Sequence, residues 1–160
     1  MALIKDGKIA ADEWRHLADE ETLPAGAQVT VSLARWQIGK NGELAGDFPL
    51  GLRLGSEAAP EDIAMDLGRF GVIVLEFPAF RDGRLFSVAR LLRERYRYAG
   101  ELRARGDFLR DQVFFLTRVG VNAFDLAEGV DPATVLPALT EFSVKYQAGA
   151  DEKLPLYRRR

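Results

Sequence analysis

The sequence predicts an α/β fold in which strands and helices alternate around a mainly parallel sheet. From residue 28 to residue 147, segments with strand character and segments with helical spacing follow one another about five times. Val72 to Phe77 form an almost continuous apolar run, which is typical of a strand covered on both faces. Strands joined by helices of this length form βαβ units with right-handed crossovers. The pattern does not distinguish between two arrangements of these strands, an open, doubly wound sheet and a half-barrel.

The N-terminal residues predict a short β-hairpin, because Asp6-Gly7 separates two short apolar runs. The acidic stretch 12–21 is expected to be helical or irregular. It contains His16, which we expect on a helix at the surface or half-buried.

The remaining elements follow from periodicity and from cap residues. We expect strands over 28–36, 50–54, 72–77, 101–105 and 122–126. We expect helices over 61–70 (after Pro60 and closed by Gly71), over 86–98, over 107–119 (with Asp107 as N-cap and Gly120 at its end), and from Pro132 onward with Asp131 as N-cap.

The size and composition indicate one α/β domain that spans residues 1–160. Of the 160 residues, 48% are hydrophobic and 29% are charged, as in globular proteins. No run approaches the length of a membrane-spanning helix, so we expect no membrane association. The N-terminus lacks the pattern of a secretory signal, and we therefore expect a cytoplasmic location.

The sequence excludes several kinds of chemistry. It contains no cysteine and one histidine, so disulfides, thiolate metal sites and multi-histidine zinc sites are ruled out. Neither a GxxxxGK[ST] motif nor a GxGxxG motif occurs. The sequence therefore points to no metal site and leaves any cofactor unknown.

Arginine is concentrated in residues 81–118, which hold ten arginines and five acidic residues although the whole chain has a net charge of -2. The guanidinium fork suits oxyanions and carboxylates, so this segment predicts a site for a small oxyanion or an acidic partner. An exposed helix face with internal ion pairs, such as Arg90 with Glu94, is the alternative. We do not expect nucleic acid as a partner, because the patch is half neutralised. The sequence does not decide whether the chain forms a homo-oligomer.

Two acidic residues are candidate catalytic groups, because ligands of parallel α/β folds bind at the carboxyl ends of strands. Glu76 lies inside an otherwise apolar run, and Asp107 follows the expected strand 101–105. Asp125 with Glu128 also falls at the end of an expected strand. The structural alternatives are an ion pair of Glu76 with Arg103 or Arg53, and a helix N-cap at Asp107.

Residues 80–126 contain a motif series that resembles a proteobacterial family of unknown function. The matching residues are Asp82-Gly83-Arg84, Phe86-Ser87, Ala89 to Tyr96, Gly100 to Ala104, Gly106-Asp107 and Leu109 to Gln112. Leu85 departs from the pattern, since members often carry glycine there. The resemblance extends from about residue 48 through the expected C-terminal helix. Members are labelled probable oxidoreductases involved in sulfite reduction, because their genes neighbour that of the sulfite reductase haemoprotein.

The resemblance and the charge pattern lead to two functional hypotheses. The first is an accessory protein of assimilatory sulfite reduction whose arginine-rich face meets a small oxyanion or an acidic partner, such as sulfite reductase. The second is a small α/β enzyme that acts on an anionic metabolite, with Glu76 or Asp107 as acid or base. The candidate binding residues are Arg84, Ser87, Arg90, Arg93, Arg103, Arg110, Asp111 and Gln112.

Overall fold

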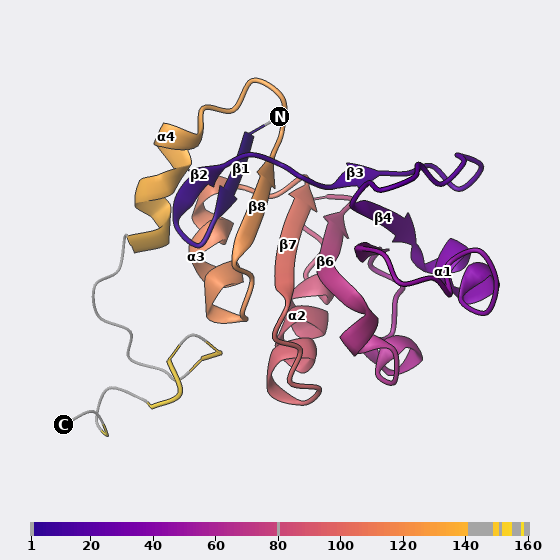
Figure 1. Cartoon of the computed structure of the whole chain (residues 1–160). Helices are drawn as coiled ribbons and strands as arrows, with labels where there is room; N and C mark the ends of the chain where they lie inside the picture. The colour runs from indigo at the N-terminus through magenta and orange to yellow at the C-terminus, as the bar shows by residue number, and fades with distance from the viewer. Residues whose placement is uncertain (1, 80, 141–148, 151, 155–157, 159–160) are drawn as a thin grey trace.

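The structure, a computed structural model, describes residues 2–79, 81–140, 149–150, 152–154 and 158 (Figure 1). The strands are β1 (Ala2–Lys5), β2 (Lys8–Ala10), β3 (Arg15–His16), β4 (Val29–Ser32), β5 (Leu50–Leu54), β6 (Phe70–Phe77), β7 (Glu101–Gly106) and β8 (Ala123–Leu126). The α-helices are α1 (Leu33–Gly39), α2 (Arg84–Glu94), α3 (Arg110–Arg118) and α4 (Pro132–Val135), and short 3-10 helices occupy Pro60–Ile63, Leu67–Arg69 and Leu136–Thr140.

The eight strands form one sheet in the order β2-β1-β8-β7-β6-β5-β4-β3. Strands β3 to β8 run parallel in chain order, whereas β1 is antiparallel to both β2 and β8. The N-terminal hairpin is present as expected, with Asp6 and Gly7 both at positive φ in its turn. Because this hairpin joins the main sheet through β8, the sheet is mixed rather than mainly parallel.

The parallel part of the sheet curls into a half-barrel. Each of the strands β3 to β8 lies beside the next one in the chain, so every crossover moves in the same direction. Figure 1 shows α2 and α3 behind the sheet on the same side. A doubly wound sheet needs a reversal of strand order and helices on both faces, so that alternative is wrong.

The two faces of the sheet differ in chemistry, because successive residues of a strand point to opposite sides. Ile73, Leu75 and Phe77 belong to the apolar core that also contains Leu85 of α2 and Val113 of α3. The alternate positions point to the inner face. By register, this inner face includes Arg53, Glu76, Glu101, Arg103, Arg105 and Asp125.

The stretch 12–21 is not helical, which corrects the expectation for His16. Arg15 and Leu17 donate backbone hydrogen bonds to the carbonyls of Gln28 and Thr30, so β3 adds a parallel strand beside β4. Pairing with the edge of β4, a strand that lies later in the chain, outweighs the local helical spacing here.

Three other element boundaries differ from the sequence prediction. The strand expected over 28–36 ends at Ser32, whose Oγ accepts the Arg35 amide at 3.1 Å and caps α1. The helix expected over 61–70 is replaced by short 3-10 turns, and Phe70 and Gly71 belong to β6. Helix α2 ends at Glu94, before the expected residue 98.

Of the two expected aspartate caps, one is confirmed and one is wrong. The Asp131 side chain accepts the Ala133 amide at 2.9 Å and caps α4. Asp107 is no N-cap, because α3 starts later, where the Leu109 amide donates to the Gln112 side chain at 2.9 Å. Residues 141–147 of the expected C-terminal helix lie outside the described residues.

Within the described part of the chain, no helix is both long enough and apolar enough to span a bilayer.

The curl leaves no room for a side chain at Gly51 on the inner face, which predicts a specific packing defect. A Cβ at Gly51 would collide with Val72 Cγ1 and would lie 2.9 Å from Thr30 Cγ2. We expect Gly51→Ala to lower the free energy of unfolding by about 1 to 3 kcal/mol in urea denaturation. Adding Val72→Ala should recover part of this loss.

The matched control is Gly68→Ala, since nothing lies within 4 Å of a Cβ at Gly68. Equal destabilisation by the two glycine substitutions would contradict the packing account.

Candidate functional site

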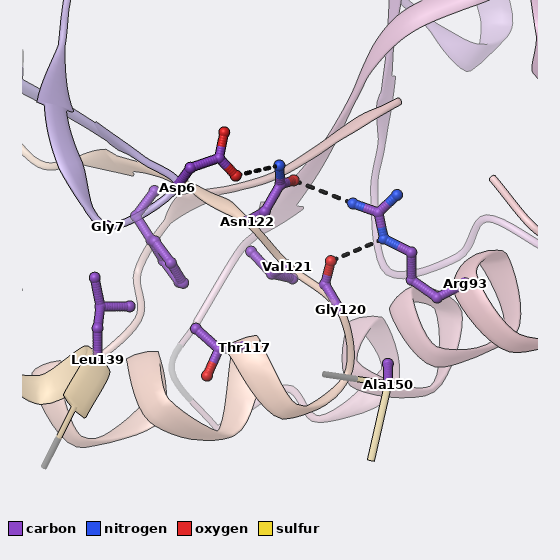
Figure 2. A pocket seen from close by; sticks show the side chains of 10 residues that line it. Asp6, Gly7, Arg93, Thr117, Gly120, Val121, Asn122, Leu139 and Ala150 are labelled. Carbon is purple, nitrogen blue, oxygen red and sulfur yellow. Dashed lines mark hydrogen bonds between the residues drawn. The ribbon is translucent and has the colours of Figure 1, made fainter. Parts of the chain in front are cut away.

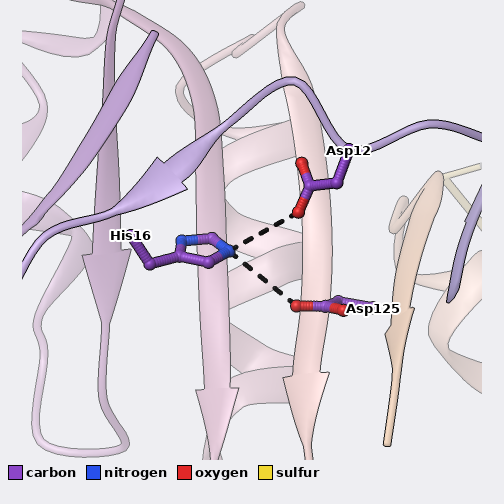
Figure 3. Close-up of side chains that lie close together, drawn as sticks. All are labelled: Asp12, His16 and Asp125. Atoms are coloured by element: carbon purple, nitrogen blue, oxygen red, sulfur yellow. Dashed lines mark ion pairs between the residues drawn. The ribbon is translucent and has the colours of Figure 1, made fainter. Parts of the chain in front are cut away.

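A cluster of His16, Asp12 and Asp125 lies on the inner face of the half-barrel. The Nε2 atom of His16 lies 3.8 Å from Asp12 Oδ2 and 3.8 Å from Asp125 Oδ2 (Figure 3). His16 comes from β3 and Asp125 from β8, although four strands separate β3 and β8 in the sheet. The curl therefore brings the first and the last parallel strands face to face. We call these three residues the inner cluster.

The third member, Asp12, lies in the segment that joins β2 to β3. Because β2 and β3 form opposite edges of the sheet, this segment has to cross the whole sheet (Figure 1). Trp14 marks its path, since the Trp14 ring lies against Gly71 of β6. The crossing places Asp12 over β7.

Arg103 of β7 fixes the orientation of Asp12. The Arg103 side chain is 1% exposed, and its Nη1 donates to Asp12 Oδ1 at 2.8 Å. Its Nε donates to Glu101 Oε1 at 2.7 Å, and Lys5 Nζ lies 2.7 Å from Glu101 Oε2. The guanidinium thus holds one oxygen of Asp12 and leaves Oδ2 toward His16.

Two buried polar atoms of the inner cluster have no hydrogen-bond partner among the described residues: Asp125 Oδ2 and His16 Nε2. Arg105 Nε lies 3.3 Å from Asp125 Oδ2, close enough for an ion pair but without hydrogen-bond geometry. The other ring nitrogen of His16, Nδ1, lies 2.6 Å from Thr30 Oγ1.

Burial and the neighbouring arginines shift the proton equilibria of the inner cluster. Burial, followed by the charge of Arg105, lowers the pKa of His16 to about 4, so the imidazole is neutral at pH 7. Burial raises the pKa of Asp125, and Arg105 opposes that effect. The pKa of Asp12 lies below its ordinary value. Burial raises this pKa, but the hydrogen bonds from Arg103 and from the Trp14 amide lower it by more than burial raises it.

The two predicted catalytic acids lie apart from the inner cluster. Glu76 is at the carboxyl end of β6 with a side chain 45% exposed, and its Oε1 lies 3.7 Å from Arg53 Nε. Of the two partners expected for Glu76, the structure thus pairs it with Arg53. Asp107 is exposed in the loop after β7, where its amide donates to the Phe77 carbonyl.

The predicted binding residues occupy different parts of the molecule. Arg103 lies on the inner face, whereas Arg84 pairs with Asp82 at the start of α2 and Arg90 pairs with Glu94. Arg110 Nε donates to the Thr134 carbonyl at 3.0 Å. Ser87 and Asp111 are exposed on α2 and α3, and Gln112 serves as a helix cap.

Arg93 is a structural clamp between α2 and the starts of β7 and β8. Its guanidinium donates to the carbonyls of Gly120, Tyr98 and Gly100 and to the side chain of Asn122. Figure 2 shows Asn122 extending this chain of contacts to Asp6 in the hairpin turn. A pocket of about 380 Å³ adjoins the clamp and is lined by Thr117, Val121 and Leu139 among others.

A second pocket, of about 260 Å³, shares Arg93 and Ala150 with the first. It is lined by Arg90, Arg93, Glu94, Arg97, Gly149, Ala150 and Lys153, and we call it the arginine pocket. Helix α2 ends before Arg97, which has a left-handed backbone with a φ of 57°. The side chains of Arg90, Arg93 and Arg97 still reach the same pocket.

Asp12 was not predicted as a site residue, and Asp125 was expected only as an acidic residue at the end of a strand. For Asp125 a signal was available, because it is the single acid of the buried strand β8, as Glu76 is in β6. No local signal marks Asp12, whose role depends on where the crossing segment lies.

Comparison with known families gives one match. A family model described as "Bacterial protein of unknown function (DUF934)" matches residues 51–157. The match confirms the expected bacterial family of unknown function and begins near residue 48, where the resemblance was expected to start. Asp12 and His16 precede the matched residues. No curated protein and no solved structure matches the chain.

The lowered pKa of His16 predicts a loss of stability in acid. The pKa of 6.5 in the unfolded chain falls to about 4 on folding, so between these values the unfolded chain binds more protons at His16. The free energy of unfolding should therefore decrease as the pH falls from 6.5 to 4, by about 2 to 3 kcal/mol. Urea denaturation in chelator-containing buffer measures this.

The variant His16→Gln is the reference, because it keeps a polar side chain but cannot titrate in this range. A wild-type profile parallel to that of His16→Gln would contradict the assignment.

The clamp predicts that Arg93→Ala destabilises the fold, because three carbonyls and one amide oxygen lose a charged donor. We expect a loss of about 3 kcal/mol in the free energy of unfolding. Arg90→Ala is the control, since Arg90 forms an exposed ion pair with Glu94, and its loss should stay below about 0.5 kcal/mol. Similar losses for both variants would disprove a special role for Arg93.

Proposed function

The chain belongs to the DUF934 family of bacterial proteins of unknown function, and we propose that it is an accessory protein of assimilatory sulfite reduction whose arginine pocket binds a small oxyanion. The proposal concerns binding rather than catalysis.

One observation carries the oxyanion part of the proposal. Arg97 and Lys153 line the arginine pocket, and the described residues offer neither of them an acidic partner. Arg93 adds a third positive charge, since its donors contact carbonyl and amide oxygens and no carboxylate. Glu94 is the one acid among the described lining residues, and it pairs with Arg90. The pocket therefore has an excess of positive charge.

The size of the arginine pocket favours a small ligand. Its volume of about 260 Å³ is just below the usual range for sites that bind drug-sized molecules, which begins at about 300 Å³. Sulfate, sulfite and phosphate present several oxygens to guanidinium and ammonium donors, which is the geometry that arginine binds best.

The sulfite-reduction part of the proposal depends on the sequence resemblance. Arg90 and Arg93 lie in the motif Ala89 to Tyr96, which carries that resemblance. Sulfite and sulfate are the oxyanions of such a pathway, so the charge of the pocket and the resemblance point to the same class of ligand.

The alternative of a small enzyme finds less support in the geometry. An enzyme that used the arginine pocket would need Glu76 or Asp107 there, and neither residue lines this pocket. Glu76 faces Arg53 on the inner face, and Asp107 lies in the loop between β7 and α3. Glu94 is engaged by Arg90.

The proposal predicts a selective stabilisation by one oxyanion. Purified protein is titrated with sulfate, sulfite and phosphate against chloride at equal ionic strength. At about 100 times its Kd, a bound anion adds about 2.7 kcal/mol, which raises the midpoint of thermal unfolding by several degrees. We expect Arg97→Asn and Lys153→Ala each to weaken binding about tenfold, because each removes a lining cation. Asparagine suits Arg97 since it tolerates the left-handed backbone.

Arg95→Asn is the matched control, because Arg95 is near in sequence and carries the same charge but faces Glu61 rather than the pocket. Equal stabilisation by all anions, or an equal loss in Arg95→Asn, would show non-specific screening and overturn the oxyanion site.

A binding assay with purified sulfite reductase tests the second part of the proposal. We expect the wild type to bind the enzyme and Arg84→Ala, which lies outside the arginine pocket, to bind equally well. If Arg97→Asn loses the enzyme and no anion stabilises the protein, the pocket is a docking face for an acidic partner. Absence of any complex would remove the link to sulfite reduction.

A further inference from the structure

We propose that Asp12, His16 and Asp125 bind a divalent transition-metal ion of the zinc class on the inner face of the half-barrel. Although the sequence pointed to no metal site, the curl of the sheet brings these three residues together. One ligand atom from each of them lies within 4.8 Å of the other two. This inference is independent of the arginine pocket, which lies on another part of the molecule.

The strongest argument is the pair of buried atoms that lack a hydrogen bond. The Asp125 side chain is 3% exposed, and its Oδ2 points at His16 Nε2, which is equally without a hydrogen bond among the described residues (Figure 3). A buried polar group left unsatisfied costs about 1 to 3 kcal/mol. A cation between the three side chains satisfies both atoms together with the free oxygen of Asp12.

The surrounding contacts hold the ligands as outer-shell partners do in metal sites. Thr30 Oγ1 contacts Nδ1 of His16 at 2.6 Å, which leaves Nε2 as the coordinating nitrogen when Nδ1 carries the proton. Arg103 holds Asp12 Oδ1 at 2.8 Å and leaves Oδ2 toward the cluster. Each of these ligands thus has one atom anchored and one atom directed inward.

The distances suit a tetrahedral site after a small contraction. Donor atoms about 2.1 Å from a zinc ion at tetrahedral angles lie about 3.4 Å apart. The separations here are 3.8 Å from Nε2 to each carboxylate oxygen. Side-chain adjustments of a few tenths of an ångström close this difference for the two distances from Nε2, and the carboxylate oxygens of Asp12 and Asp125 lie within 4.8 Å of each other. Three protein ligands leave a fourth position for water.

The donor set indicates which metals fit. One imidazole nitrogen with two carboxylate oxygens suits zinc, manganese or ferrous iron, whereas calcium and magnesium prefer oxygen ligands alone. The charged groups around the cluster reduce its affinity for a cation, because the positive charges of Arg53, Arg103 and Arg105 all act on His16 and only Arg103 is paired with Glu101. We therefore expect weaker binding than in a closed structural zinc site.

The composition makes the test unusually direct. His16 is the single histidine and the chain has no cysteine, so imidazole coordination can come from one residue only. The full chain, produced without a histidine tag and treated with a chelator, is titrated with Zn²⁺, Mn²⁺ and Mg²⁺ by calorimetry. Co²⁺ replaces Zn²⁺ for visible absorption, which reports the coordination geometry. We expect one equivalent of Zn²⁺, tetrahedral Co²⁺ bands and no comparable binding of Mg²⁺.

The variants His16→Gln and Asp125→Asn should weaken Zn²⁺ binding at least tenfold and abolish the Co²⁺ bands. Asp12→Asn is a third variant, which should also weaken Zn²⁺ binding and which keeps a side-chain oxygen that can accept from Arg103 Nη1. Circular dichroism verifies that each variant is folded. Asp66→Asn is the control and should bind like the wild type, since Asp66 pairs with Lys40 elsewhere.

Two results would overturn the proposal. The first is the absence of a stoichiometric Zn²⁺ equivalent in the wild type, which would make the cluster a polar network bridged by water. The second is equal Zn²⁺ binding in folded His16→Gln, which would place the ion on unrelated surface acids.

Discussion

Arg103 places a full positive charge inside the half-barrel, with a side chain that is 1% exposed. A buried charge is tolerated only when opposite charges and hydrogen bonds surround it. Glu101 supplies one partner from the same strand, but the other, Asp12, comes from the segment that joins the two edges of the sheet. The crossing of this segment over the inner face is therefore tied to the need to neutralise Arg103.

This crossing determines what the inner face contains. It brings Asp12 and His16 to Asp125, which lies on a strand more than one hundred residues later in the chain. The helix-covered face of the same strands is apolar and supplies the core. The sheet thus separates a side that stabilises the fold by apolar burial from a side that holds paired charges.

The two proposed sites differ in how their charges are compensated. On the inner face, arginines and carboxylates are paired closely, and the atoms left over are acceptors that suit a cation. At the arginine pocket, Arg93 donates to carbonyl oxygens, which do not neutralise its charge. The positive charge of the pocket is therefore uncompensated and suits an anion. Helix α2 and the sheet meet at Arg93, which makes the pocket dependent on the same clamp that holds the hairpin turn through Asn122.

Features that depend on neighbours in the sequence were predictable from residues alone. Asp6-Gly7 makes the hairpin turn, Asp131 caps α4, and the apolar run before Pro78 forms β6, because each depends on the backbone preferences or burial of adjacent residues. His16 in β3, the pairing of Arg103 with Asp12 and the three-residue inner cluster were not predictable in this way. Their contacts join segments that are distant in the chain, and the free energy of burying a charge depends on which of those segments the folded sheet brings together.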